Sequence, residues 1–390
     1  MASSLKVVQL YHQLLENERT AGVVLVLCTA LSLLLANSAV QEAYLGIWHH
    51  PFAGENVEYW INDGLMAIFF LMVGLELKRE INIGELSDRK RAMLPLIAAF
   101  GGMLVPAGIH LLLNHGTPFQ SGAGIPMATD IAFAVGILAL LGDRVPIPLK
   151  VFLTALAVID DLGAIFTIAI FYSTTIHWGY IGAAAAILVV MLILNKLRIV
   201  NLVPYLVLGV AMWYCMLHSG VHATVAGVLT AFAIPFSGGL NSNSAWLQHV
   251  LEKPVSFIIL PVFALANTGI ILEHDWFGHL FTSNGWGINL GLVVGKPLGI
   301  TLFCFAAITV GLSSLPTGVK WPQLMGAGAL AGIGFTMSIF ITLLAFDDPE
   351  VVVASKTAIL FASTVAGILG TIWLHLALPS KGKAKPMHKR

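Results

Sequence analysis

The chain has 390 residues, of which 57% are hydrophobic and 10% are charged, and its formal net charge is zero. Soluble domains carry about 25% charged residues, so the composition excludes a water-soluble protein and predicts an all-α polytopic membrane protein. Basic residues occur in short loops and a tail, without the folded basic face of a nucleic-acid-binding protein. The three cysteines lie in separate apolar runs, a pattern that predicts neither a disulfide nor a metal centre.

The apolar runs predict about twelve membrane-spanning helices. Each run approaches twenty residues, which at ~1.5 Å per residue cross a hydrocarbon layer of ~30 Å. Residues 1–20 are expected to form a cytoplasmic or interfacial segment, residues 21–378 one transmembrane domain, and residues 379–390 a basic cytoplasmic tail that contacts anionic lipids. The predicted spans lie at 21–36, 60–77, 92–113, 123–141, 149–173, 179–195, 202–217, 221–236, 254–272, 287–309, 322–345 and 354–378.

Positive charge is divided unequally between the two faces that these spans define. Lys and Arg gather in the loops and termini of one face, and Lys356, at the mouth of the last span, is the exception on the other. Because cytoplasmic loops carry the excess of Lys and Arg, both termini are predicted to be cytoplasmic. The loops that contain neither residue are 37–58, 114–121, 174–178, 218–220 and 273–286.

Two predicted spans, 123–141 and 322–345, contain features that break helices. The first has Pro126 followed by the polar pair Thr129 and Asp130, and the second has glycine at four positions from Gly326 to Gly334. Paired broken helices in opposite halves of a transporter mark a substrate site near the middle of the membrane. We therefore predict two inverted three-helix repeats, spans 3–5 and 10–12. In span 11 the glycines are equally consistent with close helix packing alone.

Adjacent aspartates, Asp160 and Asp161, lie in the middle of the predicted span 149–173. A carboxylate at the bilayer centre costs at least ~2.5 kcal/mol on insertion scales, and two neighbours also repel each other. The pair is therefore expected to meet water, protons or a cation, and its hard oxygen ligands suit Na+ or Li+. Consecutive helical residues point about 100° apart, so the two carboxylates are predicted to serve different partners.

A lysine completes this set of buried charges. Lys296 lies well inside the predicted span 287–309, too far from either end to reach the interface. A buried lysine needs a carboxylate partner, and either Asp160 or Asp161 is a candidate. The lysine, protons and a cation would compete for the two carboxylates, so the titrations of these groups are predicted to be coupled. If the site exchanges cytoplasmic Na+ for protons, displacement of two protons by each Na+ would make the exchange electrogenic.

Taken together, these residues resemble the NhaA-type bacterial sodium/proton antiporters over nearly the whole chain. The resemblance implies a secondary transporter of the bacterial inner membrane, with no cofactor, that takes part in sodium and pH homeostasis. It rests on the segments at 60–67, 73–80, 128–134, 159–165, 219–224, 295–299 and 332–338.

The resemblance also implies a role for each matching residue. Asp161 would be the principal cation ligand, beside Asp160, which pairs alternately with Lys296. Thr129 and Asp130 would lie where the broken spans cross, with Asp130 facing positive half-helix ends. Asp63 would be a further carboxylate of the transport core, and the pH response would involve Glu76, Lys78, Arg79, Glu80 and His222.

Simpler interpretations of the accessory residues stay open. Asp63 could be interfacial and solvated, and His222 could be a packed, hydrogen-bonded histidine. The charges from Glu76 to Glu80 could be helix-end pairs.

This chain departs from the family pattern at two places. Better-known members carry a glutamate before a histidine ahead of span 9, whereas this chain has Gln248, which cannot titrate; Glu252 is the nearest acidic substitute. The family also implies a homodimer formed through a two-stranded hairpin in the first outer loop. Residues 37–59 are few and show no strand alternation, so the sequence does not predict that hairpin.

Other functions compete with exchange. An intramembrane aspartyl protease needs two aspartates on separate helices that face one water, and the adjacent Asp160 and the charge of Lys296 argue against it. A passive cation channel would show flux without proton coupling. A carrier of small organic solutes with the same fold is a further alternative, because a fold does not determine the substrate.

Overall fold

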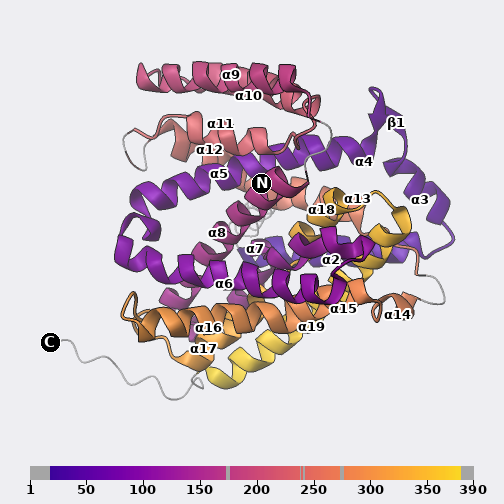
Figure 1. The fold of residues 1–390 in the computed structure, drawn as a ribbon, viewed down its shortest axis with the longest axis vertical. Coiled ribbons are helices and arrows are strands. Elements are labelled where there is room, and N and C mark those ends of the chain that lie inside the picture. The colour runs from indigo at the N-terminus through magenta and orange to yellow at the C-terminus, as the bar shows by residue number, and fades with distance from the viewer. Residues whose placement is uncertain (1–17, 173–175, 238, 240–241, 273–275, 379–390) are drawn as a thin grey trace, which may run out of the picture.

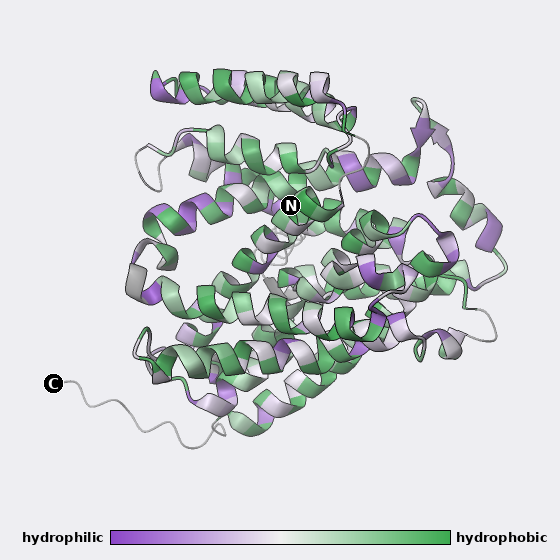
Figure 2. Cartoon of the chain, in the orientation of Figure 1, coloured by the Kyte–Doolittle hydropathy of each residue, from purple (hydrophilic) through white to green (hydrophobic). Residues whose placement is uncertain are grey.

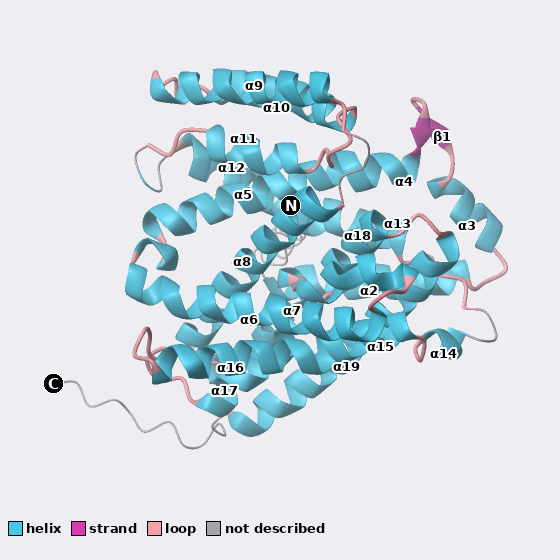
Figure 3. Cartoon of the chain, viewed as in Figure 1, coloured by secondary structure: helices cyan, strands magenta, loops and turns pink. Residues whose placement is uncertain are grey.

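The computed structural model describes residues 18–172, 176–237, 239, 242–272 and 276–378. Helices stacked side by side make up almost all of this part of the chain (Figures 1 and 3). The predicted interfacial and tail segments at 1–17 and 379–390 lie outside the described residues. The elements are α2 (Glu18–Ala36), α3 (Gln41–Trp48), β1 (Pro51–Phe52), β2 (Glu55–Asn56), α4 (Val57–Trp60), η1 (Ile61–Leu65), α5 (Met66–Ile83), η2 (Glu85–Ser87), α6 (Arg89–Asn114), η3 (Pro118–Met127), α7 (Ile131–Leu140), η4 (Gly142–Arg144), α8 (Ile147–Phe171), α9 (Trp178–Lys196), α10 (Leu202–Leu217), α11 (Val225–Ala233), α12 (Asn243–Pro254), η6 (Val255–Ile259), α13 (Leu260–Asn267), α14 (Trp276–His279), α15 (Ser283–Leu290), η7 (Gly291–Gly295), α16 (Lys296–Thr309), α17 (Trp321–Ala331), α18 (Phe335–Ala345) and α19 (Pro349–Ala377).

The chain is an all-α polytopic membrane protein. Among the described residues, seven helices are long and apolar enough to cross a membrane, and nine spans result if each bent pair counts as one. The predicted spans at 21–36 and 202–217 coincide with shorter apolar helices in α2 and α10, and the predicted span at 221–236 contains the nine-residue α11. The count of twelve therefore stays a prediction.

Large apolar side chains cover the outermost helices. α9 exposes Val189, Val190, Leu192 and Ile193. The ribbon of α9 and its neighbours is largely in the colour of hydrophobic residues in Figure 2. A soluble protein rarely exposes so extended an apolar surface, whereas lipid tails cover it at no cost. Only a small part of α9 is buried within the chain, so its exposed face is expected to contact lipid.

Both spans that were predicted to break do break. η3 and α7 meet at a bend of 41°, and α17 and α18 meet at a bend of 45°. The extended backbone of Ala128 and Asp130 separates the first pair, and Gly332–Gly334 separate the second. Asp130 N donates to Ile333 O at 2.7 Å, so the two breaks satisfy each other's backbone groups where they cross.

Wide π turns occur next to two of the predicted site residues. η1 contains Asp63, and η7 ends immediately before Lys296. Pro297 has no N–H and cannot close the regular hydrogen bond of the turn before it, which favours the wider turn there. Such π turns occur often at functional sites.

Paired glycines bring Lys296 toward the centre of the molecule. A Cβ on Gly101 of α6 would lie 2.3 Å from Gly299 O, and a Cβ on Gly299 of α16 would lie 2.1 Å from Gly101 O. The two helix backbones therefore touch, and larger residues would force them apart. This contact fixes α16, and with it the lysine, against α6.

Two features of the connections correct the sequence-based expectations. The first outer loop, predicted to have no strands, contains helix α3 and a minimal antiparallel hairpin in which Phe52 pairs with Glu55. Ala53 and Gly54, both with positive φ, form the tight turn, and two-residue strands are too short to show alternation. Gln248 and Glu252, expected in a loop, lie on helix α12, which Ser242 caps and which continues through η6 into α13.

Candidate functional site

Asp160 and Lys296 form a fully buried ion pair at the centre of the molecule. Asp160 Oδ2 lies 2.9 Å from Lys296 Nζ, and both side chains have no exposed surface. Of the two partners that the sequence left open for the lysine, the structure selects Asp160. An ion pair removed from water in this way is stable only while both partners remain, because a lone buried charge is strongly unfavourable.

The broken span 4 supplies further partners to this pair. Lys296 Nζ also donates to Met127 O, at the carboxyl end of η3, where backbone carbonyls present partial negative charge. Thr129 Oγ1 lies 2.8 Å from Asp160 Oδ2 and 3.0 Å from Ala331 O. A hydroxyl has one proton, so Thr129 donates to only one of these two acceptors at a time.

Asp130 joins the amino ends of the two half-helices α7 and α18. Its Oδ1 accepts from Phe133 N at 3.1 Å, and its Oδ2 accepts from Thr336 N at 3.1 Å and from the Thr336 hydroxyl. A carboxylate stabilises a helix amino end by accepting free N–H groups and by offsetting the helix dipole. Thr336 had no assigned role in the sequence, although it lies in the segment 332–338.

Asp161 faces a different environment from Asp160. Within the described chain both aspartates have a buried Oδ1 without a hydrogen-bond partner, so the difference lies in what surrounds the two side chains. The Asp161 side chain lines a cavity of about 300 Å³ together with Asp130, Thr336 and Thr154, and the charged Glu76, Arg79 and Glu252 line the same cavity. The two adjacent carboxylates thus have separate surroundings, one a lysine and the other a polar cavity.

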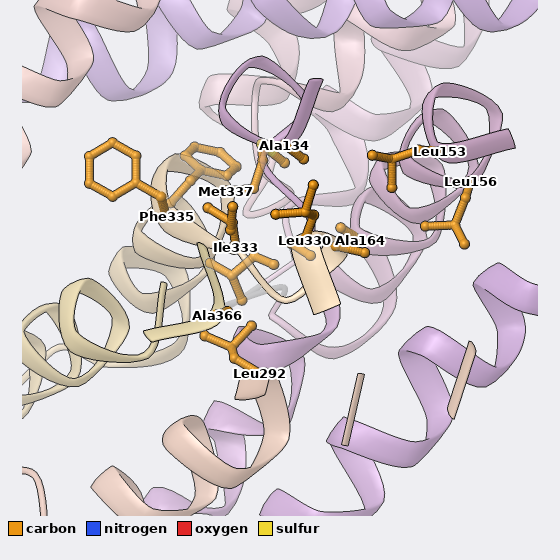
Figure 4. Packing of buried hydrophobic residues seen from close by; sticks show 14 of the residues in the cluster. Ala134, Leu153, Leu156, Ala164, Leu292, Leu330, Ile333, Phe335, Met337 and Ala366 are labelled. Atoms are coloured by element: carbon orange, nitrogen blue, oxygen red, sulfur yellow. The ribbon is translucent and has the colours of Figure 1, made fainter. Parts of the chain in front are cut away.

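Apolar side chains enclose the crossing of the broken helices. Figure 4 shows side chains of α7, α8, α18, α19 and η7 packed around Leu330 and Ile333. These residues surround the crossing with apolar side chains, and the cavity at Asp161 adjoins it on the side of Asp130 and Thr336. In apolar surroundings charges interact more strongly than in water. Binding a cation, or protonating a carboxylate, therefore changes the free energy of the site by a large amount.

Comparison with known proteins identifies the family. A family profile described as Na+/H+ antiporter 1 matches residues 12–374. The chain is 60% identical over 375 residues to the Na(+)/H(+) antiporter NhaA of Cytophaga hutchinsonii, covering 96% of this chain and 97% of that protein. It is 57% identical over 363 residues to the Na(+)/H(+) antiporter NhaA of Dechloromonas aromatica, covering 92% and 93%. The chain belongs to the NhaA-type Na+/H+ antiporter family.

Membership in the antiporter family settles the class of protein. The chain is a multi-pass bacterial membrane transporter and not an enzyme, so the intramembrane protease interpretation is wrong. Sodium and proton are the ions that family membership supports.

The predicted pH-response residues do not all lie together. Glu76, Arg79 and Glu252 line the cavity that reaches Asp161, and Gln248 lines it too. Glu80 lies next to them, with its Oε1 2.9 Å from Arg79 Nη2.

By contrast, His222 lines another cavity, of about 430 Å³, with Asp63 and Glu58, and its Nε2 lies 3.0 Å from Tyr172 O. That second cavity contains the carboxylate of Asp63, so Asp63 and His222 share one environment and the charges near Glu76 share another.

Lys78 points away from both cavities. Its Nζ donates to three carbonyls at the carboxyl end of α11, those of Ala231, Phe232 and Ile234. These carbonyls have no partner within their own helix. The contact therefore indicates a structural role for Lys78, joining α5 to α11.

Replacing Lys78 with Met is expected to lower stability with little effect on sodium affinity. The change leaves buried carbonyls without a donor, at a cost of about 1–3 kcal/mol. Thermal unfolding in detergent measures the first effect and sodium-dependent proton release the second. Lys196→Met, on the exposed end of α9, is the matched control. An unchanged melting temperature together with a shifted pH profile would restore the pH-response assignment of Lys78.

Proposed function

We propose that the chain exchanges cytoplasmic Na+ or Li+ for external protons, by alternating access to Asp161, Asp160 and Lys296. The main observation behind this proposal is that the two adjacent aspartates have different surroundings. Asp160 is neutralised by Lys296, whereas Asp161 lines a cavity without a basic partner among the residues that the structure describes. A cation that reaches Asp161 meets a carboxylate without an ion pair in the described chain, next in sequence to a second carboxylate held by a displaceable lysine.

Competition for these carboxylates couples the two ions. Na+ prefers hard oxygen ligands, and a proton on Asp161 removes the negative charge that attracts it. The described residues contain no group of three or more His, Cys, Asp or Glu side chains able to hold a metal ion. Oxygens of Thr154 and Thr336 in the same cavity, with Asp130 and water, would complete the coordination of Na+.

Charge balance favours electrogenic exchange. When Na+ binds, Asp161 loses its proton, and the ion draws Asp160 away from Lys296, which then releases a second proton. Two protons in exchange for one Na+ transfer one net charge in each cycle. Transport would then respond to membrane voltage.

The arrangement of connections supports the proposed topology, with twelve crossings, two inverted repeats and both termini cytoplasmic. In Figure 1 the hairpin, α3 and α14 all lie on the right-hand side of the molecule, at different heights. These elements come from loops without Lys or Arg. The turn between α5 and α6, rich in Lys and Arg, lies at the opposite, left-hand end.

Regulation and assembly are further parts of the proposal. Glu76, Arg79, Glu80 and Glu252 lie where their charges would alter cation entry toward Asp161. The hairpin at 51–56 has the two-stranded form expected of the family's dimer contact, and its exposed Phe52 is available to a second copy.

Proton release from acid-loaded inside-out vesicles tests this function. Addition of NaCl or LiCl is expected to dissipate the pH gradient, whereas KCl is not. In proteoliposomes, a potential imposed with K+ and valinomycin is expected to change the exchange rate. If folded native protein leaves the gradient untouched between about pH 6.5 and 8.5, a range that brackets neutral pH, the exchange proposal fails. Voltage-independent exchange would contradict the stoichiometry alone.

A further inference from the structure

A second buried lysine lies far from the ion pair of Asp160. Lys356, on α19, is 8% exposed, and its Nζ lies 3.9 Å from Glu58 Oε1 on α4. The other oxygen of Glu58, Oε2, lies 3.7 Å from His49 Nε2. Lys356 belongs to the face whose loops otherwise contain no Lys or Arg. It plays no part in the site around Asp161.

This pair separates two cavities on the predicted external face. Glu58 lines both the cavity of about 430 Å³ that contains Asp63 and a cavity of about 550 Å³ that contains Lys356. Beside it, Asn62 lines the first cavity and Asn267 the second, and Asn267 Nδ2 donates to Asn62 Oδ1 at 2.7 Å. One ion pair and one amide pair thus form the partition.

The partners of the ion pair belong to helices that pack in different groups. α4 continues through η1 into α5, which packs mainly on α11 and α12. α19 packs mainly on α15, α17 and α18, the group that contains the second broken span. The cavity at Asp161 also lies between these groups, with α5 and α12 on one side and α8 and α18 on the other. A relative movement of the groups would change both the cavity and the ion pair.

We propose that the Glu58–Lys356 ion pair is the external gate of the exchange cycle. While the inner cavity reaches Asp161, the pair holds the outer ends of α4 and α19 together. As the groups move apart the two outer cavities join, and water then hydrates both charges, so neither is left buried without a partner. In the closed arrangement Glu58 compensates the charge of Lys356, and in the open arrangement water would do so. The inference rests on the proposed alternating access at the site of Asp161.

Removing the attraction is expected to shift the protein toward its outward-open form. Glu58→Gln and Lys356→Gln should raise the KM for Na+ on the cytoplasmic side about threefold or more, because fewer molecules present the inner cavity. They should also speed labelling of Ala266→Cys, a buried position of the outer cavity, by an impermeant maleimide in right-side-out vesicles. The labelling is done in a variant whose native cysteines are replaced by serine.

Charge reversal and a matched control make the test specific. Glu58→Lys combined with Lys356→Glu should return KM and labelling toward native values, because it restores an ion pair of opposite polarity. Glu55→Gln, on the cavity of about 430 Å³ that Glu58 also lines but without an ion pair to Lys356, should change neither.

Two results would overturn the gate. The first is a folded Glu58→Gln variant whose cytoplasmic KM for Na+ and rate of maleimide labelling both equal those of the native protein. The second is a Glu55→Gln variant in which KM and labelling rate change as much as in Glu58→Gln. Native protein without sodium–proton exchange would instead overturn the function on which the gate rests, so the two failures are distinguishable.

Discussion

Asp161→Asn is expected to abolish sodium-dependent proton release while the protein remains folded. Asp161 lines the cavity and its Oδ1 has no hydrogen-bond partner in the described chain, so the isosteric amide leaves no lysine unpaired. It does remove the negative charge that would bind Na+ and the group that would carry the proton. In a bound complex Asp161 and Na+ would form a buried pair of charges. Loss of one charged partner from such a pair costs about 2–5 kcal/mol, which lowers the affinity for Na+ about 30-fold to several thousand-fold.

Vesicle assays with matched variants measure this effect. Inside-out vesicles with an acid interior receive NaCl or LiCl, and native protein, Asp161→Asn and Asp347→Asn are compared at equal amounts. Asp347 is an exposed carboxylate in the connection between α18 and α19, so its amide should transport normally. Exchange at a native rate and native KM in Asp161→Asn would exclude this residue as the ion ligand.

Lys296→Met is expected to cause the largest loss of stability. The change leaves Asp160 buried without its lysine, and removing one member of a buried ion pair costs about 3–5 kcal/mol. It also leaves Met127 O without its donor at the end of η3. The apparent melting temperature in detergent should fall by several degrees, whereas Asp161→Asn should change it little.

A double-mutant cycle isolates the ion pair itself. Asp160→Asn combined with Lys296→Met removes both charges together, so the pair should recover most of the stability that either single change loses. If the two losses simply add, the 2.9 Å contact contributes nothing beyond the separate side chains. The double mutant should still fail to exchange ions, because the displaceable lysine is gone.

The predictions for Asp161 and for the Asp160–Lys296 pair together distinguish an ion ligand, Asp161, from a positioning group, Asp160. Neighbours in sequence, Asp160 and Asp161 differ in what they touch, so the same chemical change should affect stability in one and transport in the other. Thr129 provides a third comparison, because its single hydroxyl proton serves either Asp160 or the backbone of the second broken helix.

Local composition was sufficient to establish the class of protein. Apolar length, the uneven loop charge, Pro126 and the glycines of 326–334 predicted a membrane protein with two broken spans, because hydropathy and backbone preferences act over short stretches. Charged residues inside apolar runs predicted Asp160, Asp161, Asp130 and Lys296 as the site, since burial of a charge is costly wherever it occurs. The matching segments also indicated the family.

Only the tertiary structure decided which of these residues meet. The rotation and depth of each helix select Asp160 as the partner of Lys296, place Asp130 between two half-helix ends and turn Lys78 toward α11. They also separate His222 from the cavity of Glu76. The hairpin depends on two turn residues, and α12 is too polar to read as part of a span. The Glu58–Lys356 contact joins residues almost 300 positions apart, and contacts of that range depend on helix packing rather than on local pattern.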